Sequence, residues 1–149
     1  MKNNTYSSKD FSTISAKLIA ETPEKLIHRD VLKASIAGDI DLSKQRNHLV
    51  RVVDLPSKTI SMTIGGLSPM QSTREHRHSY ETMIYIIEGE GGSIINNNKI
   101  YWKKGDAIYI PVWAFHSHFN SSKANKVLYL ATENAPLLQS LGVALRKEK

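Results

Sequence analysis

The sequence contains no cysteine among its 149 residues. This absence excludes disulfides, thiolate zinc sites, iron–sulfur clusters and a cysteine nucleophile, so any metal must be held by histidine, carboxylate or other oxygen donors. Long apolar runs are also missing. No stretch approaches the roughly 20 apolar residues of a membrane span, and the polar segment from Met1 to Asp10 lacks the apolar run of a signal peptide. We therefore expect a cytoplasmic protein with no membrane partner.

Charge of either sign is modest, at 23% of residues, while 40% are apolar. This balance is typical of a packed chain rather than a disordered one, and the length suits one domain. The net charge of +6 invites a nucleic-acid interpretation, but the lysines and arginines are scattered along the chain. We therefore expect solvated surface charge or attraction of an anionic substrate, and no nucleic-acid partner.

The first third of the chain has apolar residues at three- and four-residue intervals, from Ser12 to about Ala37. This spacing predicts two short helices, the second beginning at Thr22-Pro23-Glu24, with Gly38 and Asp39 ending the helical pattern. We interpret residues 1–48 as a helical N-terminal extension that packs on the following domain.

From residue 49 the sequence pattern changes to short runs rich in Val, Ile and Tyr, separated by turn residues. About eight strands without intervening helices predict an all-β barrel or double-sheet jelly roll over residues 49–149. A helix is expected at Pro136 to Leu145, where leucines recur at helical spacing. The predicted strands are Leu49 to Asp54, Thr59 to Gly65, Thr82 to Glu88, Gly92 to Ile95, Lys99 to Trp102, Ala107 to Ile110, Ala114 to Asn120 and Val127 to Glu133.

Two histidine pairs carry the chemical information in this sequence. His76 and His78 flank Arg77, and because side chains on a strand alternate between faces, both imidazoles point the same way. His116 and His118 form a second pair on a later predicted strand. Two strands of a small barrel can bring His76, His78 and His116 to one interior point, where neutral imidazole suits zinc, copper, iron or nickel.

At this point the sequence resembles the cupin family. The segment His76-Arg77-His78, followed by a strand that ends in Glu88-Gly89-Glu90-Gly91, is similar to the first cupin motif. The second motif is matched by the turn Gly105-Asp106, then Pro111, and then His116. The resemblance implies a double-stranded β-helix, a jelly-roll barrel. The short helical N-terminal segment and the C-terminal helix predicted from apolar spacing would flank this barrel.

Two departures from the common cupin pattern narrow the resemblance. Thr82 occupies the position of the usual glutamate ligand, and the adjacent Glu81 would face away from the histidines on a regular strand. Trp113 stands where the second motif often has glycine. Both departures resemble the branch that includes gentisate and salicylate dioxygenases, in which three histidines hold ferrous iron.

This resemblance implies a non-haem iron(II) dioxygenase acting on a small, possibly anionic, organic acid, diketone or phenol, and a homodimer. His76, His78 and His116 would hold the metal, with manganese, nickel or zinc as alternatives to iron. His118 and Tyr80 are the candidate catalytic residues, although an interior hydrogen bond would equally explain His118. Trp113, Phe115 and Thr82 are expected at the substrate pocket, or in the core. Two other functions remain open: a metal-dependent lyase, isomerase or cyclase, and a ligand-binding cupin without catalysis.

Overall fold

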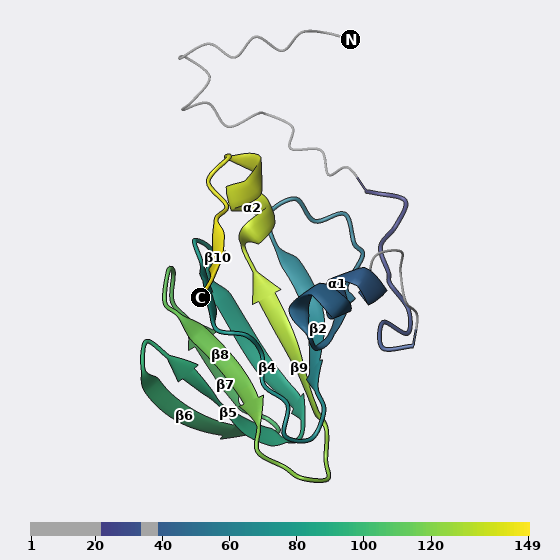
Figure 1. Cartoon of the computed structure of the whole chain (residues 1–149). Coiled ribbons are helices and arrows are strands. Elements are labelled where there is room, and N and C mark those ends of the chain that lie inside the picture. The colour runs from purple at the N-terminus through teal and green to yellow at the C-terminus, as the bar shows by residue number, and fades with distance from the viewer. Residues whose placement is uncertain (1–21, 34–38) are drawn as a thin grey trace, which may run out of the picture.

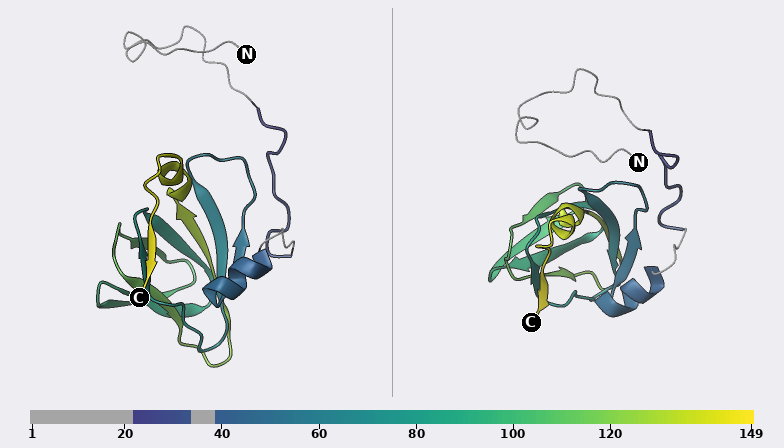
Figure 2. Two further views of the ribbon diagram at one scale, coloured as in Figure 1. Left: turned by 45° about the horizontal axis from the view of Figure 1, so that its top comes forward. Right: turned by 90° about the horizontal axis from the view of Figure 1, so that it is seen from above.

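The computed structural model describes residues 22–33 and 39–149, and β-strands dominate the described chain. Ten strands form two five-stranded antiparallel sheets, in the orders β1-β2-β9-β4-β7 and β10-β3-β8-β5-β6. The sheets face each other as a cupin sandwich, as Figures 1 and 2 show. The strands are β1 Leu49–Val52, β2 Ser61–Leu67, β3 His76–His78, β4 Thr82–Glu88, β5 Glu90–Ile95, β6 Asn98–Lys103, β7 Ala107–Ile110, β8 His116–Asn120, β9 Val127–Glu133 and β10 Arg146–Glu148.

The all-β prediction is confirmed, and the strand β4 shows why the sequence adopts it. Thr82, Ile84 and Ile86 are buried, whereas Met83 and Tyr85 between them are exposed. This alternation is the period-two pattern of a strand with one face on a core. The buried face joins a core made from both sheets, whose members are Leu67, Ile84, Ile86, Trp102, Ile110, Val127, Tyr129 and Ala131.

The N-terminal region contains a short helix, as predicted, but at a different position. Residues 22–33 contain a turn at residues 31–33 but no helix, and the rest of the predicted helical stretch lies outside the described residues. Leu26 is 67% exposed and Ile27 is 55% exposed, so this segment has no packed apolar face, and a short helix without one is marginal in water. The helix α1, Asp39–Arg46, begins where the helical pattern was expected to end.

Helix α1 is tied to the first sheet through two polar side chains. The Asp39 carboxylate accepts a hydrogen bond from the backbone N–H of Val52, at 3.1 Å. The Ser43 hydroxyl donates to the carbonyl of Val50, at 3.0 Å, and accepts from its N–H, at 2.9 Å. α1 therefore lies against β1, the edge strand of this sheet, and Figure 1 shows it at that side of the sandwich. The helix therefore occupies a fixed place at the edge of the sandwich.

The C-terminal helix is confirmed but is shorter than predicted. Helix α2, Ala135–Ser140, ends before Gly142, whose φ of 73° lies in the left-handed region that glycine tolerates best. Figure 1 shows α2 beyond the end of β9, and the chain then turns back as β10. β10 pairs antiparallel with β3, placing Arg146 opposite His78 and Glu148 opposite His76. Across the described residues, no helix is long and apolar enough to cross a membrane.

Candidate metal centre

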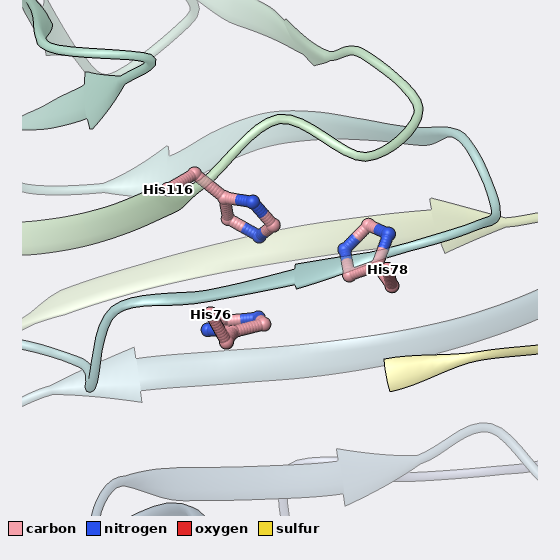
Figure 3. A group of neighbouring side chains, drawn as sticks. All are labelled: His76, His78 and His116. Carbon is pink, nitrogen blue, oxygen red and sulfur yellow. The ribbon is translucent and has the colours of Figure 1, made fainter. Parts of the chain in front are cut away.

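His76, His78 and His116 form one cluster inside the sandwich. β3 supplies the first two, and its pairing with β8 sets His76 directly opposite His116. One ring nitrogen from each histidine lies within 4.8 Å of those of the other two, and Figure 3 shows the three rings turned toward one shared space. As predicted from the alternation of side chains along β3, His76 and His78 thus point to the same side of the strand and meet His116.

The hydrogen bonds of the three rings determine which nitrogen is available. His76 Nδ1 lies 2.9 Å from the carbonyl of Arg74, His78 Nδ1 lies 2.7 Å from that of Tyr80, and His116 Nδ1 lies 2.9 Å from that of Ala114. A carbonyl oxygen can only accept, so each Nδ1 carries the proton. Each Nε2 is thereby left with a free lone pair, which is the form in which a neutral histidine binds a metal.

The three rings are held in their neutral form by burial. Desolvation, and next the neighbouring His116, lower the pKa of His78 to about 4. The same two causes lower the pKa of His76, and desolvation lowers that of His116. A burial penalty on the charged ring keeps the lone pairs free at neutral pH. Three neutral nitrogen donors of this kind fit a divalent transition metal such as iron or zinc.

The cluster opens into a cavity of about 190 Å³ between the two sheets. This volume is below the roughly 300–1,000 Å³ of pockets for drug-sized ligands, so the cavity suits a small molecule. Both ends of the described domain contribute to its wall. The lining residues are Leu42, Arg46, His48, Val50, Thr63, Gly65, Thr73, His76, His78, Tyr80, Thr82, Ile84, His116, His118, Tyr129, Ala131, Glu133 and Arg146.

Three of the other predicted site residues lie at this cavity. Tyr80 stacks on His78, with ring centroids 4.0 Å apart and an interplanar angle of 3°. Thr82 is buried, and its hydroxyl donates to the carboxylate of Glu133, at 3.3 Å. His118 is buried beside His116, with 5.6 Å between the ring centroids, and desolvation lowers its pKa to about 3. These three residues therefore line the same cavity as the histidine cluster.

Trp113 and Phe115 lie elsewhere, and neither belongs to the described wall of the cavity. Both rings pack against the outward-facing guanidinium of Arg77, which lies 4.4 Å from the Trp113 centroid and 4.5 Å from the Phe115 centroid. Phe115 directly precedes His116 on the chain, so its side chain faces the opposite side from that ligand. The two rings thus pack against β3 on the face opposite the histidines instead of lining the cavity.

Trp113 explains one of the two departures from the cupin pattern. Its φ of 63° is in the left-handed region, where glycine is the residue of least cost. The contact with Arg77 and a hydrogen bond of 2.8 Å from its N–H to the carbonyl of His78 hold it there. At the other departure, Thr82, the adjacent Glu81 does not replace the missing carboxylate, because its side chain accepts a bond of 2.7 Å from the exposed Tyr109 hydroxyl and does not belong to the cluster.

The cavity residues that were not predicted from the sequence include one histidine and three residues with charged side chains, namely His48, Arg46, Arg146 and Glu133. His48 was treated there as an isolated histidine, yet it lines the cavity with its Nδ1 2.9 Å from the carbonyl of Arg46. Arg46 comes from α1 and Arg146 from β10, and burial, then the like charge of Arg146, lowers the pKa of Arg46. Glu133 ends β9, and desolvation raises the pKa of its carboxyl. Its strand gave a signal, because Glu133 continues the inward series Tyr129 and Ala131.

Known proteins share both the domain and its fold. Residues 64–132 match the cupin domain family. A stretch of 85 residues is 32% identical to 5-aminosalicylate 1,2-dioxygenase from Comamonas sp., covering 57% of this chain and 22% of that protein. Another of 63 residues is 33% identical to gentisate 1,2-dioxygenase from Streptomyces sp., covering 42% of this chain and 18% of that protein. The chain thus matches less than a quarter of the length of either curated relative.

A solved structure agrees with the fold. Salicylate 1,2-dioxygenase from Pseudaminobacter salicylatoxidans superimposes with a TM-score of 0.66 at 21% identity, covering 78% of this chain and 38% of that one. The same enzyme has also been solved with gentisate bound. Residues 64–132 thus form a cupin domain whose sequence is related to part of the gentisate and aminosalicylate 1,2-dioxygenases, and the salicylate 1,2-dioxygenase structure agrees with its fold.

Proposed function

We propose that this protein is an iron(II)-dependent dioxygenase that cleaves a small aromatic hydroxy acid. The observation that carries the proposal is the set of three Nε2 lone pairs, from His76, His78 and His116, converging at a small cavity. Three protein ligands on one side leave positions open for other molecules, as in other non-haem iron oxygenases. When bound, iron(II) would supply coordination of the acid and of dioxygen, and thereby the oxidative chemistry.

The charges of the cavity support an anionic substrate. Arg46 and Arg146 line it from two different elements, and the repulsion between two like charges is relieved when a carboxylate joins them. Both arginines also approach Glu148, at 3.9 Å and 3.3 Å, so part of their charge is already balanced. The dioxygenase relatives are named for salicylate, 5-aminosalicylate and gentisate, which are acids of this class.

Other residues of the protein shape the cavity and orient the rings around it. Thr82, Ile84 and Ala131 give the cavity apolar and weakly polar walls that fit one aromatic ring. Tyr80 fixes the ring plane of His78 by stacking on it. Gly65 lets the Tyr129 ring lie close over β2, because a Cβ at residue 65 would come within 2.2 Å of Tyr129 Cζ. The substrate is thus confined beside the metal ligands.

Oxygen consumption tests the proposal. The protein, made without a histidine tag, is loaded anaerobically with iron(II) and mixed with salicylate, gentisate or 5-aminosalicylate in an oxygen electrode. We expect uptake with at least one acid, matched by loss of the aromatic absorbance. Benzoate, which lacks the neighbouring hydroxyl, and the zinc-loaded protein serve as controls. Binding of these acids without any oxygen uptake by the iron-loaded protein would contradict dioxygenase activity.

A second function has support from one observation, the carboxyl group of Glu133. A buried carboxyl whose pKa is raised suits proton transfer, which a metal-dependent lyase, isomerase or cyclase requires. Such an enzyme would work without dioxygen and with zinc in place of iron. Exchange of substrate hydrogen with deuterated water under argon would favour it, whereas binding with neither exchange nor oxygen uptake would favour a ligand-binding cupin.

A further inference from the structure

His118 differs from the four other histidines of the cavity in the partner of its Nδ1. The Nδ1 atoms of His48, His76, His78 and His116 each lie within 2.9 Å of a backbone carbonyl. His118 Nδ1 instead lies 2.7 Å from the hydroxyl oxygen of Ser93, which is opposite it across the β5–β8 ladder. A hydroxyl can donate as well as accept, so this contact does not by itself assign the proton.

The position of the His118 proton is assigned by Trp102, the third side chain in this hydrogen-bonded series. The Trp102 indole N–H donates to the Ser93 oxygen at 2.9 Å, and an indole nitrogen can only donate. Ser93 is fully buried, and in the described structure its hydroxyl has only these two partners. If His118 also donated to it, the Ser93 hydroxyl proton would be buried without an acceptor, which is unfavourable. Ser93 must therefore donate to His118 Nδ1.

The strands hold this chain of three side chains in place. Gly91 pairs with Trp102 across the β5–β6 ladder, and a Cβ at residue 91 would lie 2.7 Å from Trp102 Cη2, so the glycine makes room for the indole. On the other side, Thr73 accepts from the backbone N–H of His118, at 2.9 Å, and donates its own N–H to the carbonyl of His118, also at 2.9 Å. The His118 ring is thus fixed from both ends.

We propose that Trp102 and Ser93 are positioning residues that hold His118 with its proton on Nε2, the reverse of the three candidate metal ligands. In this tautomer the ring has no free lone pair and does not become a fourth ligand. Its edge at the cavity presents an N–H group, which donates a hydrogen bond to an oxygen of the acid bound beside the metal. This donor role rests on the proposed function, but the tautomer does not.

The test is nitrogen NMR of the full chain with ¹⁵N-labelled histidine, loaded with diamagnetic zinc. In the wild type we expect His118 Nδ1 to be unprotonated, with the shift of a hydrogen-bond acceptor, and Nε2 to carry the proton. In Ser93→Ala the Nδ1 resonance should move toward that of a free acceptor nitrogen. Trp102→Phe keeps the Ser93 hydroxyl but frees its lone pair, so some His118 should shift its proton to Nδ1.

Ligand titration supplies the second measurement. Ser93→Ala should bind salicylate roughly tenfold more weakly in the zinc-loaded protein, a loss of about 1.4 kcal/mol, while its zinc affinity stays within about twofold of the wild type. Ser117→Ala is the matched control, since Ser117 lies between His116 and His118 on β8 and faces the other side. The control should change neither value.

Two results would overturn the inference: a proton on His118 Nδ1 in the wild type, or an Nε2 signal showing metal coordination. Unchanged spectra in both Ser93→Ala and Trp102→Phe would also overturn the positioning role. A failure of the proposed dioxygenase activity can be distinguished from a failure of this inference, because the activity is measured by oxygen uptake and the tautomer by NMR. The expected spectra with no uptake would uphold the assignment of the His118 proton while removing the oxygenase.

Discussion

At the scale of single residues, the site depends on hydrogen bonds from the histidine rings to nearby backbone carbonyls, which the sequence pattern does not reveal. Each candidate ligand gives its Nδ1 proton to a carbonyl only two residues away, at Arg74, Tyr80 and Ala114. These bonds orient the rings through local backbone geometry instead of through distant side chains. Removal of one ring should therefore affect the metal far more than the fold.

His76→Ala and His116→Ala test this separation. We expect each variant to lose metal affinity by more than about 100-fold, above the 10–100-fold cost of losing a ligand's outer hydrogen-bond partner. Metal content after gel filtration and the circular dichroism melting curve are the measurements. His28→Ala, which changes a histidine outside the cluster, should retain the metal. Full occupancy in both cluster variants would show that the metal binds elsewhere.

Thr82→Glu tests the position where most cupins carry a carboxylate. Thr82 is 3% exposed and contacts Glu133, so a glutamate here would place two carboxylates at one cavity. Like charges should weaken the binding of an anionic acid roughly tenfold, about 1.4 kcal/mol, without loss of metal. The control Thr82→Gln has the same size without the charge. Equal salicylate affinity in the wild type and both variants would place Thr82 away from the substrate.

At the scale of elements, the cavity is completed by pieces that lie outside residues 64–132 of the family match. Helix α1 contributes Arg46, and β10 contributes Arg146 while pairing with the strand that bears His76 and His78. α1 and β10 approach each other through Glu148, which contacts both arginines. The cupin core thus supplies the candidate metal ligands, and the flanking elements supply the positive charge.

Arg146→Gln tests whether β10 supplies positive charge that binds the substrate, with Arg74→Gln as its matched control. Both arginines contact Glu148, at 3.3 Å and 3.2 Å, but only Arg146 lines the cavity. We expect Arg146→Gln to weaken salicylate binding to the zinc-loaded protein by about 10–100-fold, or roughly 1.4–2.7 kcal/mol, and to leave benzyl alcohol binding unchanged. The control should keep the wild-type affinity for salicylate. Equal losses in the two variants would assign the effect to Glu148.

The sequence predicted those parts of the structure that follow from local periodicity. The alternation along His76-Arg77-His78 placed two imidazoles on one face, and the β4 and β9 boundaries agree with the predicted strands. The same rule, applied to Phe115 beside His116, would have turned that ring outward. Arg146 reaches the cavity through β10, which begins directly after the predicted helix Pro136 to Leu145 and was not predicted as a strand, because no local pattern reports such a distant pairing.

At the scale of the whole molecule, the cavity concentrates neutral imidazole in a chain with a net charge of +6. Five of the six histidines line it: His48, His76, His78, His116 and His118. Protonation of these rings would add charge beside Arg46 and Arg146 in a poorly solvated space. The net positive charge attracts an anion from a distance, while the candidate ligand rings stay neutral and can bind a metal cation.

This arrangement predicts that the metal-free protein loses stability in acid. The folded pKa values of His78, about 4, and His118, about 3, lie below the unfolded value of about 6.5. Below pH 6.5 these histidines therefore bind protons in the unfolded chain but stay neutral in the folded chain. The free energy of unfolding consequently falls as the pH drops toward 4. Each fully buried ring contributes up to about 1.4 kcal/mol per pH unit.

Urea denaturation of the chelator-treated protein at pH 7, 6, 5 and 4 measures this slope. His118→Gln removes one of the buried rings, so its stability should fall less steeply than that of the wild type over the same range. Zinc at 100 times its dissociation constant should add about 2.7 kcal/mol at pH 7 and progressively less in acid, because the metal competes with protons for the same lone pairs. An equal slope in the wild type and His118→Gln would mean that His118 is protonated equally in the folded and unfolded states, and its burial would then not be the cause of acid sensitivity.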